Sequence, residues 1–326
     1  MYDTIIIGSG PAGLAASIYA SRYKLSNLII GKMPGGTIAY AHKVENYPGV
    51  PDIAGVELGQ KMMEQARALG GKILGENVGK IEKLGEKGEW GKEGEMGFRT
   101  FTETGKEFEA KTLIVASGTE RRKLNIPGEE EYLGKGVSYC TNCDAPFFKG
   151  KTVVLVGGAN AACSGAVHLA EYAEKVYLIY RKSELRAEPV WVQEVKSNPK
   201  IEVIYGTNLT KILGKEGKGG REGVEGTGKV TKVEIDNPYK DEKILKTDGV
   251  FVEIGGVPAT EFLKPMGMEL DENGYIKVSG EMETSVAGLF AAGDVTDKSL
   301  ILQQTITACA QGAIAGYSAF KYLKRK

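Results

Sequence analysis

The chain opens with a short apolar run that predicts a buried β-strand. The segment from Asp3 to Gly8 is rich in isoleucine, and a short apolar run of this kind is typical of a strand covered on both faces. A glycine-rich turn at residues 8–13 follows, Leu14 to Tyr23 indicates a helix, and Asn27 to Ile30 indicates a second strand. The turn has the pattern G-x-G-x-x-G, whose glycines let the backbone approach a pyrophosphate at a helix N-terminus. This beginning of the chain therefore predicts a dinucleotide-binding unit.

The same unit recurs later in the chain. Lys151 to Val156 predicts a strand, residues 157–162 form a second turn with fewer glycines, a helix runs to about Tyr172, and Val176 to Tyr180 predicts another strand. The two turns begin 149 residues apart (157 − 8 = 149). Repetition of a whole supersecondary unit indicates a duplicated architecture. We therefore expect an α/β fold with two Rossmann-like dinucleotide-binding domains, each a three-layer arrangement around a central parallel sheet.

The remaining pattern predicts one more strand, a terminal helix and two loops. Residues 288–294 read Gly-Leu-Phe-Ala-Ala-Gly-Asp and lead into a helix from about Gln304 to Tyr322. Two stretches carry glycine at every third position: Gly85, Gly88, Gly91, Gly94 and Gly97, then Gly214, Gly217, Gly220, Gly223 and Gly226. Such short runs without proline cannot form a collagen triple helix. We expect them to be solvated, mobile loops at hairpin tips.

Length and composition limit the class of protein. A chain of 326 residues with 42% hydrophobic residues is long enough for two domains with their own cores. Lys plus Arg equals Asp plus Glu at 42 each, so no net field favours nucleic acid or an anionic membrane. No apolar stretch approaches the length of a membrane span, and the first strand begins at residue 3 without a charged leader. We expect a cytoplasmic protein that binds neither nucleic acid nor membrane.

A pair of cysteines, Cys140 and Cys143, followed at once by Asp144, is the strongest candidate for chemistry. Cys-x-x-Cys can close a short reversible disulfide, and a helix start or a positive group nearby lowers a thiol pKa enough to supply thiolate. A carboxyl group beside the pair can shuttle the proton that each exchange step moves. The same spacing is also half of a zinc site, but Cys163 and Cys309 are singletons and neither histidine belongs to a second pair. We expect a redox-active disulfide, no metal, and two ordinary core thiols at 163 and 309.

The motifs, taken in their order, resemble one known family. They are residues 8–13 (Gly-Ser-Gly-Pro-Ala-Gly), 35–37 (Gly-Gly-Thr), 44–49 (Val-Glu-Asn-Tyr-Pro-Gly), 116–118 (Ala-Ser-Gly), 140–144 (Cys-Thr-Asn-Cys-Asp) and 292–294 (Ala-Gly-Asp). Together they resemble the low-molecular-weight thioredoxin reductases, and the likeness spans nearly the whole chain. The resemblance implies an FAD-binding domain of residues 1–117 and 249–326. An inserted domain of residues 118–248 would bind NAD(P)H and carry the disulfide.

The resemblance also implies which residues contact FAD. They are Gly8, Gly10, Pro11, Ala12, Gly13, Gly35, Gly36, Thr37, Asn46, Ala116, Gly118, Gly293, Asp294, Gln304 and Thr305. Two positions depart from expectation. Gln303 and Gln304 stand where the family has Arg-Gln, after an apparent two-residue insertion, and Gly31-Lys32 stands where the general fingerprint has an acid for a ribose.

The family also implies the path of the electrons, from NADPH through FAD and the disulfide to a small dithiol protein such as thioredoxin. Cys143 would face the flavin, Cys140 would attack the partner's disulfide, and Asp144 would be the acid and base. Asp144 can alternatively be the N-cap of a following helix, or serve both roles. The resemblance further implies a homodimer, and rotation of the inserted domain about hinges near Gly118 and Asp248-Gly249.

The electron donor is predicted from the second glycine turn and the strand after it. The turn, Gly157-Gly158-Ala159-Asn160-Ala161, has a methyl group at 159 where the family has its central glycine, which weakens the phosphate signature. The segment after the next strand carries three cations, Arg181, Lys182 and Arg186, which resemble the family's motif for a 2′-phosphate. Cations without a carboxylate at the strand end favour NADPH over NADH. NADH, ferredoxin and a reduced deazaflavin remain alternative donors.

Two other classes of function fit the motifs less well. A flavoprotein that reduces a peroxiredoxin partner would carry an extra N-terminal dithiol domain, whereas this sequence begins at its FAD strand; ferredoxin and flavodoxin reductases lack the cysteine pair. A flavin-bound redox sensor is the non-enzymatic alternative. Slow, single reduction without catalytic turnover would distinguish the sensor from the enzyme.

Overall fold

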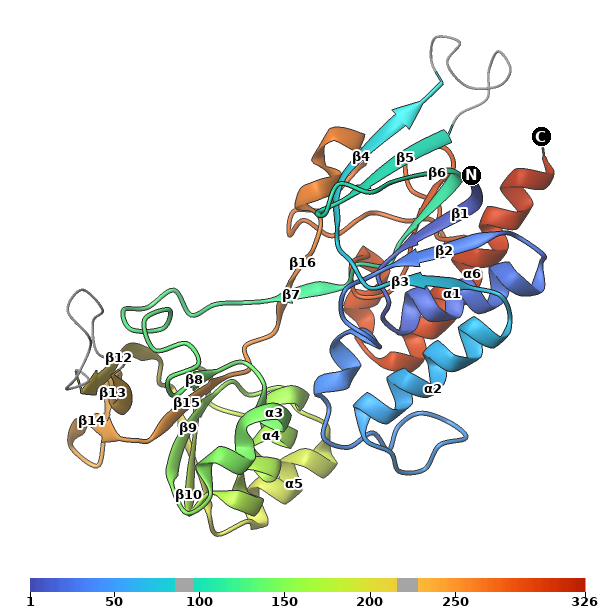
Figure 1. The fold of residues 1–326 in the computed structure, drawn as a ribbon. Coiled ribbons are helices and arrows are strands. Elements are labelled where there is room, and N and C mark those ends of the chain that lie inside the picture. The colour runs from blue at the N-terminus through green and yellow to red at the C-terminus, as the bar shows by residue number, and fades with distance from the viewer. Residues whose placement is uncertain (86–96, 216–227, 326) are drawn as a thin grey trace. The chain divides into compact units, whose positions relative to one another are not determined.

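Two sheets with parallel strands at their centre organise the chain, one in each of two units (Figure 1). The computed structural model describes residues 1–85, 97–215 and 228–325. Unit 1 comprises Met1–Glu120 and Val257–Lys326, and unit 2 comprises Arg121–Gly256. Helices pack on the parallel strands of both units, so the expected α/β class with Rossmann-like elements is confirmed.

Unit 1 is built on a seven-stranded sheet. Its elements are β1 (Tyr2–Ile7), α1 (Pro11–Arg22), β2 (Asn27–Ile30), η1 (Gly36–Tyr40), α2 (Gly55–Ala68), β3 (Lys72–Leu74), β4 (Val78–Leu84), β5 (Gly97–Thr102), β6 (Glu107–Val115), η3 (Glu261–Met266), β17 (Leu289–Ala291), η4 (Asp297–Ile301) and α6 (Thr305–Lys324). Strand order is β3-β2-β1-β6-β5-β4, and β17 pairs with β6. The strands β1, β2, β3, β6 and β17 run parallel, whereas β4 and β5 form an antiparallel extension. The isoleucine run of β1 is buried because strands flank it on both sides and helices cover the sheet.

Unit 2 contains the second parallel sheet and a small antiparallel one. Its elements are β8 (Val137–Ser138), α3 (Thr141–Asp144), η2 (Ala145–Phe148), β9 (Thr152–Val156), α4 (Asn160–Tyr172), β10 (Lys175–Tyr180), α5 (Pro189–Ser197), β11 (Ile201–Tyr205), β12 (Leu209–Lys215), β13 (Lys229–Tyr239), β14 (Glu242–Lys246) and β15 (Gly249–Val252). The parallel sheet has the order β11-β10-β9-β15-β8. The antiparallel sheet has the order β12-β13-β14.

The boundary between the units differs from the expected one. The strand β15 belongs to the parallel sheet of unit 2, where it pairs with both β9 and β8, although the boundary expected after residue 248 would separate it from them. All four of its residues are buried, because the strand lies inside the sheet rather than at its edge. The chain passes between the units through a two-stranded ribbon of β7 (Thr119–Arg121) and β16 (Gly256–Pro258).

The two glycine-rich stretches connect antiparallel strands, as expected of hairpin tips. Leu84 pairs with Gly97, and Lys215 pairs with Lys229, so each stretch joins the ends of one hairpin. Residues 86–96 and 216–227 lie outside the described residues, and the predicted mobility of these loops stays a prediction. Among the helices that the structure describes, none has the length and apolar character needed to cross a membrane.

Close contact between α1 and α6 depends on small residues. A Cβ atom at Gly312 would lie 2.0 Å from the carbonyl oxygen of Ala12, and one at Gly316 would lie 2.7 Å from that of Ala16. Backbone atoms cannot move aside as a flexible side chain can. Glycine at these positions therefore lets the helix after the last strand press against the helix of the first glycine turn.

We predict that Gly312→Ala lowers the free energy of unfolding by about 1–3 kcal/mol, because the added methyl group overlaps the Ala12 carbonyl and the helices must separate. Urea unfolding followed by circular dichroism measures the change. Gly75→Ala is the matched control, because a Cβ atom there meets nothing within 4 Å. Equal stability of the two variants would contradict this account of the packing.

Candidate active site

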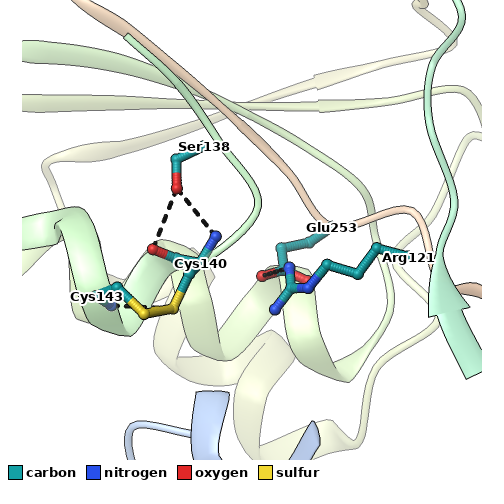
Figure 2. The surroundings of a disulfide bond; sticks show 5 residues. All are labelled: Arg121, Ser138, Cys140, Cys143 and Glu253. Atoms are coloured by element: carbon teal, nitrogen blue, oxygen red, sulfur yellow. Dashed lines mark hydrogen bonds and ion pairs between the residues drawn. A yellow bond between two sulfur atoms is a disulfide. The ribbon is translucent and has the colours of Figure 1, made fainter. Parts of the chain in front are cut away.

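The cysteine pair forms a disulfide at the end of β8 (Figure 2). Cys140 and Cys143 are bonded with their Cα atoms 5.3 Å apart. Cys140 is the N-cap of the short helix α3 and Cys143 lies within it, so this helical turn brings the two sulfurs together. Cys143 is exposed and Cys140 is half-buried. The backbone N–H of Cys143 donates to Sγ of Cys140 at 3.1 Å. Such a donor stabilises negative charge on Cys140 when the disulfide is reduced, because a thiolate is a better acceptor than a thiol.

Ser138, the last residue of β8, holds the backbone of Cys140. The N–H of Cys140 donates to Oγ of Ser138 at 3.0 Å, and that hydroxyl donates to the carbonyl of Cys140 at 3.3 Å (Figure 2). Ser138 is buried, so these bonds are shielded from water. Ser138 was not predicted from the sequence, although its place two residues before the first cysteine was a usable signal.

Asp144 lies at the junction of α3 and η2. Its N–H donates to the carbonyl of Cys140 at 3.2 Å, and its side chain makes no capping hydrogen bond. Asp144 therefore occupies the N-cap position of η2, as the alternative expected, but its carboxylate does not cap that helix by a hydrogen bond. The predicted acid and base role remains a prediction.

The expected FAD residues of the first glycine turn meet three other segments within unit 1. A Cβ atom at Gly36 would lie 2.6 Å from Cα of Gly10, and one at Gly293 would lie 2.8 Å from Cβ of Ala12. Gly8 has φ +115°, and a Cβ atom there would lie 2.1 Å from the carbonyl oxygen of Ala116. These close approaches leave a loop of bare backbone at the start of α1. The fold thus brings together the segments around residues 8–13, 35–37, 116–118 and 293–294.

The other expected FAD residues lie at the start of α6 and in the loop before α2. The side-chain amide of Asn46 donates to Oε1 of Gln304 at 3.1 Å, across 258 positions of sequence. Gln304 is also the N-cap of α6, with a reciprocal capping box to Thr307, and Thr305 is the first helical residue. Pro11 and Gly13 begin α1, Thr37 lies in η1, and Gly35 precedes it. Gly118 has φ +65° and open space around it.

Asp294 has the surroundings of a ligand-binding carboxylate. It follows β17 and is largely buried, and burial raises its pKa to about 6. Its side chain makes no hydrogen bond to another residue in the part of the chain that the structure describes. The N–H of the preceding Gly293 donates to Oε1 of Gln311 at 2.8 Å, which fixes the backbone beside it. A buried carboxylate without donors suits a ligand that brings hydroxyl groups.

The second glycine turn keeps its backbone conformation despite Ala159. Ala159 is the N-cap of α4 with φ −104° and ψ −173°, and Gly10 occupies the same place before α1 with φ −81° and ψ −178°. Both conformations are open to any residue, so the methyl group causes no backbone strain. Gly157 has φ +146°, and the ring of Tyr180 packs where a Cβ atom of Gly158 would lie. The loop is therefore formed in unit 2 as in unit 1.

The three expected phosphate-binding cations lie beside this second loop. The N–H of Arg186 donates to the carbonyl of Gly158 at 2.7 Å, and the side chain of Asn160 forms two hydrogen bonds with Glu188. These bonds fasten the segment after β10 to the glycine loop. The side chains of Arg181, Lys182 and Arg186 are exposed. None of the three forms an ion pair with another described residue, which leaves their charges available to an anion.

The two remaining thiols lie in the cores of their units. Cys163 is fully buried on α4, and burial raises its pKa to about 11. Cys309 is half-buried on α6 against the core of unit 1, and burial raises its pKa as well. Their high pKa values disfavour thiolate, which agrees with the expectation of ordinary core thiols.

Comparison with known proteins identifies the family. The model of the pyridine nucleotide-disulphide oxidoreductases matches residues 2–312. The chain belongs to this family. A thioredoxin reductase of Bacillus subtilis (strain 168) is 39% identical over 325 residues, which are 99% of this chain and 95% of that protein. The predicted resemblance to low-molecular-weight thioredoxin reductases is confirmed.

Solved structures of thioredoxin reductases also match this chain. Lactococcus lactis thioredoxin reductase in its FR conformation matches with a TM-score of 0.88 at 33% identity, over 100% of both chains. A ferredoxin-flavin thioredoxin reductase from Clostridium acetobutylicum is also 33% identical, with a TM-score of 0.51 over 100% of this chain and 99% of that one. Membership of the family implies that the chain uses a flavin and that its Cys140–Cys143 disulfide is a redox centre.

The pKa of Asp294 predicts how the flavin-free protein responds to pH. The folded pKa of about 6 lies above the ordinary 3.8, so this group's contribution to stability is complete below pH 3.8 and is lost as the pH rises through 6. At pH 7.5, Asp294→Asn should therefore raise the unfolding free energy of the flavin-free protein by on the order of 2–3 kcal/mol, and at pH 4 by little. The same variant should retain less flavin, because it loses the charged acceptor.

Urea unfolding of the flavin-free protein at the two pH values checks the prediction. Asp241→Asn is the control, because this exposed carboxylate lies in the turn between β13 and β14, far from any glycine loop in sequence. A gain of equal size at both pH values would contradict the assigned pKa.

Proposed function

We propose that this protein is a thioredoxin-disulfide reductase that passes electrons from NADPH through FAD and the Cys140–Cys143 disulfide to a thioredoxin-like dithiol protein. The observation that carries the proposal is the disulfide at the end of β8. This strand belongs to the same parallel sheet as β9, which ends at the second glycine loop. The thioredoxin reductases that resemble it over the whole chain support the same reaction. We also propose that it acts as a homodimer in the cytoplasm.

Unit 1 would hold FAD. Gly8, Gly10, Gly13 and Gly36 leave bare backbone at the N-terminus of α1 for a pyrophosphate, and Asp294 offers an acceptor for sugar-alcohol hydroxyls. Asn46 and Gln304 fix each other at the start of α6. A bound flavin accepts two electrons from a nicotinamide and returns them to a disulfide.

Unit 2 would hold NADPH. The exposed N-terminus of α4, with Gly157 to Ala161, suits the pyrophosphate, and Arg181, Lys182 and Arg186 suit the 2′-phosphate. The cations support NADPH over NADH, since a ribose diol without a phosphate would call for a carboxylate at the end of β10.

The dithiol formed on reduction would exchange with the partner in two steps. The Cys140 thiolate attacks one sulfur of the partner's disulfide, forms a mixed disulfide and releases a partner thiolate, which takes a proton from Asp144. The Cys143 thiol then loses its proton to Asp144 and attacks Cys140. This step reforms the Cys140–Cys143 disulfide and releases the second partner thiolate, which takes a proton from solvent. Overall, NADPH, one proton and the oxidised partner give NADP⁺ and the reduced partner.

A different electron donor is the second candidate, because the ferredoxin-flavin thioredoxin reductase is as identical to this chain as the Lactococcus lactis enzyme. The dithiol chemistry would be the same. NADH or a reduced deazaflavin would likewise leave it unchanged. Repeated turnover with any of these donors would exclude the flavin-bound redox sensor.

We predict that the two cysteines give different trapped products. Cys143→Ser should abolish turnover and accumulate a mixed disulfide between Cys140 and thioredoxin, because the attacking sulfur has no second thiol to release it. Cys140→Ser should abolish turnover without this complex. Non-reducing electrophoresis and intact-mass measurement identify the product, and Cys163→Ala is the control that should turn over normally. Trapping by Cys140→Ser alone would reverse the assigned roles.

We predict that Arg181→Ala raises KM for NADPH about tenfold or more and changes KM for NADH little, because the side chain is expected to contact only the 2′-phosphate. Steady-state reduction of thioredoxin with each nucleotide measures both constants. Lys243→Ala, which removes an exposed cation from β14, should change neither. An equal rise of both KM values would argue against a phosphate site at residue 181.

A further inference from the structure

Four strand ends of unit 2 place four functional segments in a row. The strands β10, β9, β15 and β8 are neighbours in that order, and all run parallel. Their carboxyl ends lead directly into Arg181, Gly157, Glu253 and Tyr139-Cys140 respectively. Neighbouring strands lie about 4.8 Å apart, so these segments follow one another along a single edge of the sheet. Glu253 occupies the place between the glycine loop and the disulfide.

Glu253 lies at the point of the sheet where the strand order reverses. From β9 the chain runs through α4 to β10 on one side, whereas β15 lies on the other side of β9. Ligands of open parallel sheets bind outside the carboxyl ends of the strands at such a reversal. The N–H of Glu253 donates to the carbonyl of Val156 at 2.9 Å, and a Cβ atom at Gly157 would lie 2.2 Å from the carbonyl oxygen of Glu253. Glu253 therefore lies directly beside the glycine loop at this reversal.

Unit 1 has a residue in the equivalent place. A Cβ atom at Gly8 would lie 2.1 Å from the carbonyl oxygen of Ala116, which follows β6, the neighbour of β1. Glu253 stands to Gly157 as Ala116 stands to Gly8. A small residue suffices at that place in unit 1, so the loop itself does not require a carboxylate in unit 2.

The carboxylate of Glu253 is only partly satisfied by the protein. Its side chain is 13% exposed, and Oε1 accepts from Nη1 of Arg121 at 3.0 Å. The second oxygen accepts no hydrogen bond from the described residues. Burial raises the pKa of Glu253 to about 7 even though Arg121 lowers it. Figure 2 shows the pair in the surroundings of the disulfide.

We propose that Glu253 binds the nicotinamide nucleoside of the electron donor and that Arg121 positions its carboxylate. With the 2′-phosphate near Arg181 and the pyrophosphate at the Gly157 loop, the next part of an extended dinucleotide reaches Glu253. That part offers ribose hydroxyls and a carboxamide N–H, which are donors for a carboxylate oxygen. The oxidised ring is also a cation, which a carboxylate attracts. The inference rests on the proposed use of NADPH and adds the residue that recognises its reactive half.

Two ligands that differ by the nicotinamide nucleoside test the proposal. The FAD-loaded enzyme is titrated with NADP⁺ and with 2′,5′-ADP, which has the adenosine and its 2′-phosphate but no nicotinamide nucleoside, and each Kd is measured by calorimetry. Glu253→Gln should weaken NADP⁺ about tenfold and leave 2′,5′-ADP within about twofold. Arg181→Ala should weaken both ligands. The double variant Arg121→Gln with Glu253→Gln should behave like Glu253→Gln, and it removes any effect of the Arg121 charge once its Glu253 carboxylate is gone.

Glu202→Gln is the matched control. Glu202 lies near the N-terminal end of β11, at the opposite edge of the same sheet from Glu253, and it forms ion pairs with Lys175 and Lys240. Its replacement should change neither Kd. Unchanged NADP⁺ affinity in both Glu253 variants would overturn the proposal. So would equal weakening of both ligands, since that result would mean that Glu253 only supports the loop.

A second measurement separates this inference from the proposed function. Enzyme reduced with dithionite is mixed with oxidised thioredoxin in a single turnover, which needs no nucleotide. If the wild type reduces thioredoxin but does not bind NADP⁺, the inference is overturned and the dithiol reductase stands. If the wild type fails to reduce thioredoxin after dithionite, the proposed function itself fails.

Discussion

Unit 2 depends on one constraint, which is that every strand of a parallel sheet ends at the same edge. A cation, a glycine loop, a carboxylate and a cysteine therefore lie along that edge, at the ends of β10, β9, β15 and β8 respectively. In the sequence these residues are spread between positions 140 and 253. Antiparallel pairing would send alternate strand ends to opposite edges and separate them. The disulfide can therefore lie at the same sheet edge as the nucleotide loop, although the two segments are not adjacent in sequence.

The glycine loops of the two units have the same backbone geometry. Gly8 and Gly157 each have positive φ and leave space for a carbonyl of the neighbouring strand's extension, and Gly10 and Ala159 each precede a helix in extended conformation. The common geometry needs glycine only at the first of these positions. The central position is open in conformation, so a methyl group there alters the approach of a ligand rather than the loop.

A largely buried carboxylate follows one strand of each parallel sheet, beside each proposed ligand site. Asp294 follows β17 in unit 1, and Glu253 follows β15 in unit 2, and burial raises the pKa of each well above its ordinary value. A folded protein gains nothing by itself from an acid held in this way, because ionisation at neutral pH costs free energy. A ligand that brings hydroxyl or amide donors offsets that cost, which makes stability and ligand binding opposing demands on these two positions.

The sequence by itself determined the local elements and the chemistry of the disulfide. The apolar runs and glycine turns predicted β1, β9, α1, α4 and the C-terminal helix because their periodicity and turn residues are local properties. The order of motifs indicated the family, which the comparisons confirmed. Only the tertiary structure showed that β15 belongs to unit 2, because the sequence of a four-residue apolar strand does not determine which sheet the strand joins. It alone also brought Arg121 to Glu253, Ser138 to Cys140 and Asn46 to Gln304, because hydrogen bonds between segments depend on strand order and register, which no single stretch of sequence contains.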